Sequence, residues 1–234
     1  MKKVGIILLL LIMSSCAAKK VTIEEIGNSK SISVYETTKD FINNVMQLNA
    51  KIIIKEESKK HIKVSKIFDS KTELKIKNWR SFWAIEYNNE LYFNLLYSKE
   101  LLRERVFAKL DIKGKLCAVI IDKDSPEILK PSKHSNVHVG ARSISIDIYK
   151  SKREQPLGKH HWKDKNGNSK AILLIETVYL VPKFASRKEG SFGFYLNYSF
   201  LKDLIKDYNI KNVGNLKDVN FERVIEIIHE INRQ

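Results

Sequence analysis

The chain has 234 residues and a formal net charge of +15, from 42 Lys and Arg against 27 Asp and Glu. This length suffices for one substantial core, and with only two cysteines a disulfide-stabilised scaffold is excluded. The basic balance is compatible with nucleic acid, anionic lipid or anionic polysaccharide as a partner. The lysines are scattered rather than gathered in one run, which favours a compositional bias over a dedicated basic patch.

The first residues predict an export signal. Two lysines precede an unbroken apolar run over residues 4–13, and two serines follow it. A ten-residue helix is about 15 Å long, half the thickness of a hydrocarbon core, so this run is too short to cross a bilayer. The small residues after it are those a cleavage site requires. We therefore expect residues 1–15 to be a signal peptide.

The segment MSSC (residues 13–16) resembles the lipobox of bacterial lipoproteins, although the family usually has Leu where Met13 stands. The resemblance implies that Cys16 is acylated and becomes the mature N-terminus. Several acyl chains hold a protein on a bilayer without a transmembrane helix. Ala17 and the two lysines after it imply, by the sorting rules of such proteins, the periplasmic face of the outer membrane. The alternatives are an ordinary cleaved signal with an incidental cysteine and an uncleaved anchor.

Export determines which partners remain. Nucleic acid is excluded as a physiological partner, which leaves the bilayer, an envelope protein or an anionic polysaccharide. Once Cys16 is acylated, Cys117 is the remaining thiol, so no intramolecular disulfide forms and the core must supply the stability. Cys117 lies in KLCAVIID, an apolar run typical of a buried strand, which predicts a small buried hydrophobe rather than a nucleophile.

Residues 16–30 are predicted to be the lipidated cysteine and a tether, and residues 31–234 a single domain. A short helix is expected around Phe41 to Leu48. The runs IKVSKIF and LKIKNW alternate in part, and RSISIDIYK (residues 142–150) alternates cleanly. Alternation of this kind favours an antiparallel sheet with one face in water.

Three segments predict hairpins. Two aromatic-rich runs meet at Asn88-Asn89, the segment 106–122 turns at Gly114, and the segment beginning HHWKDKNGNSK turns at Asn166-Gly167. The last turn, DKNGNS, also resembles part of a calcium loop. Its Gly falls at the fourth position instead of the sixth, so a hairpin turn explains it better.

Two C-terminal segments place apolar residues at helical spacing. SFLKDLIKDYN has Ser199 as the expected N-cap, and NFERVIEIIHEI has Asn220. The buried stripe of the second helix is expected to comprise Phe221, Val224, Ile225, Ile228 and Ile231. The predicted fold is therefore α+β, with a mainly antiparallel, hairpin-rich sheet, a short N-terminal helix and two C-terminal helices.

Three segments, VYETTKDFINN, WAIEYNNELYFNLLYS and FAKLDIKGKLCAVIID, resemble a group of small uncharacterised lipoproteins of Bacteroidetes-type bacteria. The resemblance covers about residues 34–125, and its motifs are structural: a capped helix and two hairpins. The group has no assigned activity or catalytic residues. The resemblance therefore implies the envelope compartment and transfers no chemistry.

Candidate chemistry centres on histidines. A composite site could combine His134 or His138 with His160 or His161 and a carboxylate such as Asp122, whereas solvated loop histidines are the simpler interpretation. Adjacent residues on a strand point to opposite faces, so only one of the His160-His161 pair would join a site.

No metal or cofactor is expected, because neither a P-loop nor a dinucleotide fingerprint is present. The aromatic residues between positions 79 and 97 would suit either sugar stacking or, more simply, cross-strand pairing.

The sequence thus predicts a membrane-anchored envelope lipoprotein with a non-catalytic binding or structural role. An envelope hydrolase with a His/carboxylate site and an immunity-type lipoprotein that neutralises a toxin are the alternatives. The catalytic candidates for the hydrolase are His138, His160 and Asp122, and the lipidation site is Cys16.

Overall fold

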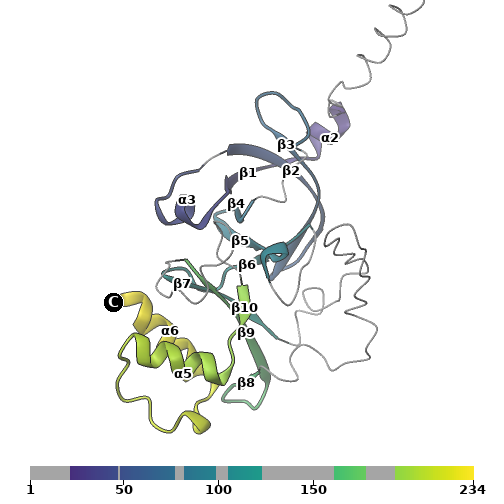
Figure 1. Cartoon of the computed structure of the whole chain (residues 1–234). Helices are drawn as coiled ribbons and strands as arrows, with labels where there is room; N and C mark the ends of the chain where they lie inside the picture. Colours follow the sequence, from purple (N-terminus) through teal and green to yellow (C-terminus); the bar gives the residue numbers. More distant parts are fainter. Residues whose placement is uncertain (1–21, 47, 77–81, 99–104, 123–160, 178–192) are drawn as a thin grey trace, which may run out of the picture.

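Six antiparallel strands close into a barrel in the computed structural model, which describes residues 22–46, 48–76, 82–98, 105–122, 161–177 and 193–234. A smaller antiparallel sheet packs beside the barrel, and two C-terminal helices cover the far face of that sheet (Figure 1). The predicted α+β class is confirmed. The elements, in chain order, are α2 (Ile23–Gly27), β1 (Lys30–Tyr35), α3 (Thr38–Ile42), β2 (Leu48–Glu57), β3 (His61–Asp69), β4 (Ala84–Tyr87), β5 (Glu90–Asn94), η3 (Leu95–Tyr97), β6 (Val106–Lys109), β7 (Leu116–Ile121), β8 (Trp162–Lys163), β9 (Ser169–Glu176), β10 (Gly193–Tyr195), α5 (Tyr198–Asp207), η6 (Leu216–Asp218) and α6 (Phe221–Arg233).

The barrel follows the strand order β1-β2-β3-β6-β5-β4, and β4 pairs again with β1. Side chains alternate between its two surfaces, as strand geometry requires. Ile85 and Phe107 belong to the apolar cluster inside the barrel, whereas their neighbours Ala84 and Ala108 belong to the cluster outside it. The strands β4, β5 and β6 are therefore apolar on both surfaces, which explains their near-continuous hydrophobic runs.

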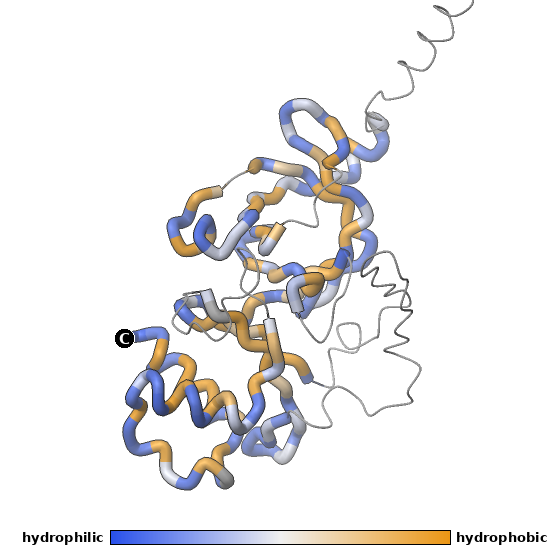
Figure 2. Tube along the Cα trace, viewed as in Figure 1, coloured by the Kyte–Doolittle hydropathy of each residue, from blue (hydrophilic) through white to orange (hydrophobic). Residues whose placement is uncertain are grey.

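The small sheet has the order β10-β9-β7, with β8 also paired to β9. One face packs on the outside of the barrel through residues such as Cys117 and Leu173, and the other packs on the helices through Ala118 and Leu174. Figure 2 shows the apolar course of the chain through this middle layer. Both faces are thus buried, and the sheet joins the barrel to the helices.

The two C-terminal helices cover that sheet. Asn220 caps α6 as predicted, its Oδ1 accepting the N–H of Arg223 at 2.9 Å. The predicted cap of α5 is wrong, because Asn197, two residues before Ser199, accepts the N–H of Phe200 at 2.9 Å. Both Asn and Ser make good N-caps, so the packing of the preceding segment selects between them.

The buried stripe of α6 differs from the prediction at one position. Ile227 is fully buried, whereas Ile225 is only partly buried at the edge of the same cluster. Because Ile227 is buried beside Ile228, the buried face of α6 is wider than the stripe predicted from the spacing. Both C-terminal helices themselves are confirmed.

Two of the three predicted hairpins are confirmed. Asn88 and Asn89 have φ of 50° and 60° between β4 and β5, the conformation of a type I′ turn. Gly167 has φ of 79° in the turn between β8 and β9. The run 142–150, the second half of LKIKNW and the position of Trp79 lie outside the described residues.

The predicted hairpin over residues 106–122 is wrong. Strand β6 pairs with β3 and β5 in the barrel, whereas β7 pairs with β9 in the small sheet. Between them, Ile112 makes an isolated antiparallel bridge with Ala118. The turn at Gly114 is real, but it reverses the chain onto residues 111–112 instead of onto β6.

The short N-terminal helix begins and ends earlier than predicted. Thr37 and Asp40 form a capping box at the start of α3, and the helix ends at Ile42, well before Leu48. A further short helix, α2, lies within the segment predicted as tether, and Glu25 forms an ion pair with Lys66 of β3. No helix among the described residues is long and apolar enough to span a membrane.

One turn ties the last helix to the small sheet. The side chain of Asn232 accepts the N–H of Leu116 at 2.8 Å and donates to its carbonyl at 2.9 Å. The Thr177 hydroxyl donates to the carbonyl of Gly114, 2.9 Å away. A Cβ at Gly114 would lie 2.5 Å from Cγ of Asn232, and Gly114 has φ of 155°. The position therefore requires glycine.

We expect Gly114→Ala and Asn232→Ala to lower the free energy of unfolding by about 1–3 kcal/mol each, because either change leaves the backbone groups of Leu116 without partners. The two changes should not be additive. Removing the Asn232 side chain also removes the clash, so Gly114→Ala should cost less in the Asn232→Ala background. Urea unfolding of the two single variants and the double variant measures this coupling, and strictly additive losses would contradict the contact.

Candidate functional site

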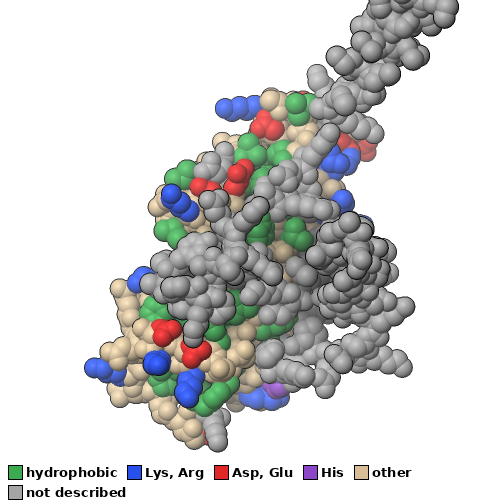
Figure 3. Space-filling model, in the orientation of Figure 1, with side chains coloured by type: hydrophobic (Ala, Val, Ile, Leu, Met, Phe, Trp, Pro, Cys, Tyr) green, Lys and Arg blue, Asp and Glu red, His purple; other side chains and the backbone are tan. Residues whose placement is uncertain are grey.

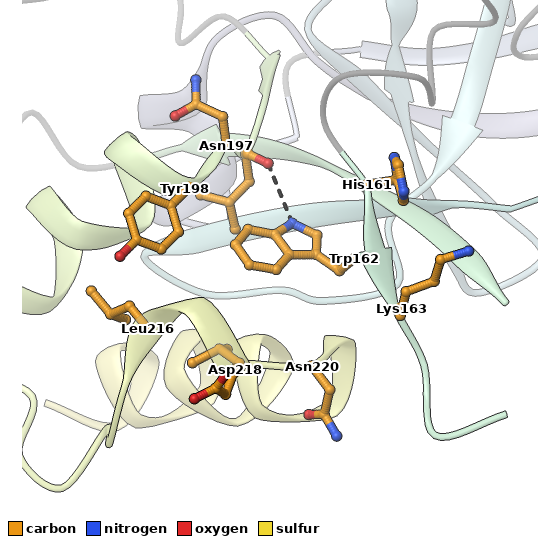
Figure 4. A pocket seen from close by; sticks show the side chains of 10 residues that line it. His161, Trp162, Lys163, Asn197, Tyr198, Leu216, Asp218 and Asn220 are labelled. Atoms are coloured by element: carbon orange, nitrogen blue, oxygen red, sulfur yellow. Dashed lines mark hydrogen bonds between the residues drawn. The ribbon is translucent and has the colours of Figure 1, made fainter. Parts of the chain in front are cut away.

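A pocket of about 440 Å³ opens between β8 and the N-terminal ends of α5 and α6. Three short segments, far apart in the sequence, bring its walls together (Figure 4). The lining residues are His161, Trp162, Lys163, Leu196, Asn197, Tyr198, Leu216, Asp218, Val219 and Asn220. We refer to it as the β8 pocket.

Trp162 forms the inner wall of the β8 pocket. Its side chain is buried with the helices, and its Nε1–H donates to the carbonyl of Leu196 at 3.3 Å. The N–H of Leu196 in turn donates to Ile172 of β9 at 2.8 Å. The indole is therefore held in one orientation by the sheet behind it, so this wall is formed before any ligand binds.

The outer wall is more exposed and combines apolar with polar groups. Tyr198 is 44% exposed, and its ring lies near Leu216 in Figure 4. Asp218 accepts a hydrogen bond from Nδ2 of Asn215 at 2.9 Å. Pockets with mostly apolar walls and a few placed polar groups suit ligands that carry an apolar body and a small number of hydrogen-bonding groups.

The turn between β8 and β9 supports one end of the pocket. Asp164 accepts the N–H groups of Asn166 at 2.9 Å and Asn168 at 2.8 Å, which closes the turn. The first turn of α6 contacts it, because Glu222 accepts the N–H of Lys165 at 3.2 Å. This segment is a hairpin turn, as the sequence indicated, and its carboxylate is used by backbone donors.

The electrostatics of Asp164 follow from these bonds. Burial would raise the pKa of its carboxyl group, but the hydrogen bonds from Asn168 and Asn166 and the nearby Lys170 outweigh burial and lower the pKa. The ammonium of Lys170 lies 3.6 Å from the carboxylate and 5.0 Å from the centre of the Phe221 ring. The turn and the start of α6 are thus connected through one lysine.

A second hollow of about 400 Å³ lies on the outside of the barrel between β1, β2 and β4. Its lining is mostly hydroxyl and amide residues, with Ile32, Ala50 and one carboxylate, that of Glu86, which accepts a hydrogen bond from the Tyr35 hydroxyl at 3.3 Å. Burial and Glu86 raise the pKa of Tyr35. This hollow lacks the aromatic wall that the β8 pocket has.

Sequence reasoning did not single out His61, which is buried at the tip of the β2–β3 hairpin. Its Nδ1 lies 2.8 Å from Oγ of Ser58, and its Nε2 lies 3.5 Å from Glu56. The Ser58 oxygen also accepts the N–H groups of Lys60 and His61, at 3.2 and 3.1 Å. The Ser58 hydroxyl therefore closes the β2–β3 turn, and Glu56, Ser58 and His61 form a local hydrogen-bonded group that stabilises this turn.

The register of the small sheet shows where the candidate site residues His161 and Asp122 lie. Trp162 pairs with Lys170, and Ile121 pairs with Ala171, so His161 and Asp122 both lie at this end of the small sheet, on either side of β9. Both residues lie just outside the paired strands, next to Trp162 and Ile121, which belong to the clusters on the helix side and the barrel side of the sheet.

The other candidate residues have mixed outcomes. Cys16, His134, His138 and His160 lie outside the described residues. Among the residues that the structure describes, no group of three His, Cys, Asp or Glu side chains is placed to hold a metal ion.

The predicted burial of Cys117 is confirmed. Its side chain is fully buried in β7, and burial raises the pKa of the thiol to about 11. Trp83, Tyr87, Tyr92 and Phe93 are also buried, so the described aromatic residues form core rather than an exposed stripe.

Searches of protein-family models, curated proteins and solved structures found no match to this chain.

Asp164 gives the fold a specific pH dependence. A carboxyl whose folded-state pKa lies below its ordinary value of about 3.9 stabilises the fold at higher pH, and this contribution is lost as the pH falls through the folded-state pKa. We expect Asp164→Asn to be less stable than the wild type at pH 7. The difference should shrink progressively below about pH 4.

Urea unfolding at pH 7, 5 and 3 measures this difference. Asp203→Asn, on an exposed position of α5, is the matched control and should leave the free energy of unfolding almost unchanged. A difference for Asp164→Asn that stays constant from pH 7 to pH 3 would show that the charge of Asp164 does not act in this way.

Proposed function

We propose that this protein is a membrane-anchored cell-envelope lipoprotein that binds a partner in the β8 pocket. The observation that carries the proposal is the position of the pocket relative to the N-terminus. Helix α2, the first described element, lies on the barrel, whereas β8, α5 and α6 lie at the opposite end of the molecule (Figure 1). An anchor at Cys16 would hold the barrel beside the bilayer and present the pocket to the aqueous side.

The connection between the anchor and the fold is short. Five residues lie between Cys16 and Thr22, the N-cap of α2, so the six Cα–Cα steps from Cys16 to Thr22 span at most about 20 Å when fully extended. The ion pair between Glu25 and Lys66 joins α2 to the outside of β3. Acylation of Cys16 therefore favours an arrangement in which the barrel is the layer nearest the lipid. The residues after Cys16 favour the periplasmic face of the outer membrane as the location.

The pocket lining favours a protein segment over an anionic polysaccharide. Trp162, Tyr198 and Leu216 supply apolar surface, and Asp218 supplies negative charge. The ammonium of Lys163 already donates to Oγ of Ser169 at 2.8 Å. A segment that carries an apolar side chain beside charged groups of both signs would complement Asp218 and Lys163. Neutralising an incoming toxin, the immunity-type alternative, would be one case of such binding.

Charge over the fold agrees with this choice of partner. Among the residues that the structure describes, Lys and Arg only slightly outnumber Asp and Glu, so most of the excess positive charge belongs to other parts of the sequence. In the space-filling view the coloured acidic and basic side chains are interspersed (Figure 3). On the face drawn in Figure 3, the described side chains form no broad positive patch.

The hydrolase alternative receives less support. Its His/carboxylate chemistry needs the two groups within hydrogen-bonding reach of one substrate atom, and the β8 pocket is lined by His161 but not by Asp122. Sites that would use His138 or His160 lie outside the described residues and stay a prediction. Binding is the function that the described geometry supports best.

The anchor is tested by Cys16→Ser. The wild type should begin at Cys16, carry added acyl mass and partition with membranes, whereas the variant should lack the acyl mass and either keep its signal sequence or become soluble. Intact-mass measurement of both proteins after detergent extraction, together with membrane fractionation, measures this. A mature wild-type chain without acyl mass would overturn the lipoprotein assignment.

The pocket is tested by placing a photo-crosslinking amino acid at Tyr198, which lies at the exposed rim. We expect a discrete crosslinked partner in envelopes of the native organism, and at least a five-fold weaker product from the same group at Lys211. Lys211 is exposed between α5 and η6 and does not line the pocket. Equal crosslinking at the two positions, or none at Tyr198, would argue against a partner in the pocket.

A further inference from the structure

An exposed apolar loop follows α3. Among the described residues, four large hydrophobic side chains are exposed, and three of them belong to this loop: Ile42 at 51%, Val45 at 46% and Met46 at 53%. The fourth, Tyr198, belongs to the β8 pocket. We call residues 42–46 the α3 loop. Exposed apolar side chains gathered within five residues are a candidate contact surface.

The α3 loop has a defined backbone. Asn44 has φ of 51°, its N–H donates to the carbonyl of Phe41 at 3.1 Å, and the N–H of Val45 donates to that of Asp40 at 2.8 Å. These two bonds form a Schellman motif, the hydrogen-bonded end of a helix. The exposed side chains are therefore presented from a fixed turn.

The turn is also fixed to the barrel. The ring of Phe41 lies 5.8 Å from that of Tyr35 and 5.1 Å from that of Trp83, centre to centre. Tyr35 and Trp83 are themselves almost fully buried in the cluster between the barrel and the small sheet. A contact made by the α3 loop therefore orients the whole barrel rather than one mobile segment.

We propose that the α3 loop inserts into the lipid surface to which Cys16 is anchored, so that the barrel rests on the bilayer at two points. This inference rests on the lipoprotein assignment made above. It adds a second, non-covalent contact and a fixed orientation, with the β8 pocket directed away from the membrane. The α3 loop and α2 both belong to the barrel end of the molecule in Figure 1.

Distances permit both contacts at once. Strand β1, six residues long, separates α2 from the start of the α3 segment by about 20 Å. The chain from Cys16 to Thr22, with five residues in between, also reaches about 20 Å when extended. The acyl chains and the loop can therefore meet one bilayer surface. Lys39, exposed beside the loop, is placed to meet lipid phosphate.

The size of the patch favours lipid over a second protein. Three half-exposed side chains offer a few hundred Å² at most, whereas a stable protein interface buries about 800 Å² on each partner. Shallow insertion needs no such area, because apolar side chains have only to pass about 5–10 Å into the headgroup boundary. A lipid surface that already holds the chain by its acyl groups needs only this small additional contact.

The test uses the full lipidated protein in vesicles of phosphatidylethanolamine and phosphatidylglycerol. An environment-sensitive fluorophore is attached at Val45→Cys or, as the matched control, at Lys211→Cys. Cys16 is acylated and Cys117 is fully buried with a raised pKa, so labelling is directed to the introduced thiol. The same two positions in Cys16→Ser protein, free in buffer, give the reference signal.

We expect at least a two-fold rise in emission with a blue shift at position 45 on vesicles and no change at position 211. Replacing the neighbours Ile42 and Met46 by Ser should reduce the signal at position 45, which separates insertion of the loop from partition of the fluorophore itself. A signal at position 45 equal to that of the control, in protein whose intact mass includes the acyl groups, overturns the proposal.

Two further outcomes are decisive. Missing acyl mass contradicts the lipoprotein assignment, and in that case added vesicles of the same composition still test the loop on the free protein: no response at position 45 overturns the insertion. A blue shift that depends on protein concentration without vesicles would show that a second copy covers the loop, which also overturns it.

Discussion

The structure depends on one constraint: the small sheet of β7, β9 and β10 is buried on both faces. One face packs on the outside of the barrel and the other on α5 and α6, so neither can face water. This requirement accounts for the continuous apolar sequence of β7 and for the apolar stripes of both helices. Without the sheet, the outer surface of β4, β5 and β6 would be exposed, and the helices would have no surface to cover.

Local turn chemistry explains which elements could be predicted. Asn88-Asn89 and Asn166-Gly167 define their turns within a few residues, so the chain needs no distant contact to adopt them. Asn220 at the start of α6 is equally local. The hairpin around Gly114 was mispredicted because a turn signal shows that the chain reverses, and not which strand the next one pairs with. Strand β7 pairs with β9. Its sequence did not indicate this partner, because its apolar residues run without alternation.

The pocket shows the same limit of sequence reasoning in another form. Its walls come from residues near positions 162, 198 and 218, and no pattern within any one segment indicates that they meet. His161 drew attention through its chemistry, yet Trp162 beside it forms the wall. Successive side chains of a strand point to opposite faces, so the register of β8 against β9 was needed to see that the Trp162 side chain faces the helices.

Closure of the barrel bears on how neighbouring molecules would associate if they were held on one membrane surface. If the chain is anchored as proposed, its copies would move in two dimensions and meet far more often than the same number in solution, which would favour strand-to-strand association between neighbours. In the barrel, every strand from β1 to β6 is hydrogen-bonded on both sides, so it has no unpaired strand edge to template a neighbour's backbone. Among the described strands, unpaired edges therefore belong to the small sheet, at strands such as β7 and β10, and the barrel offers none to a neighbouring molecule.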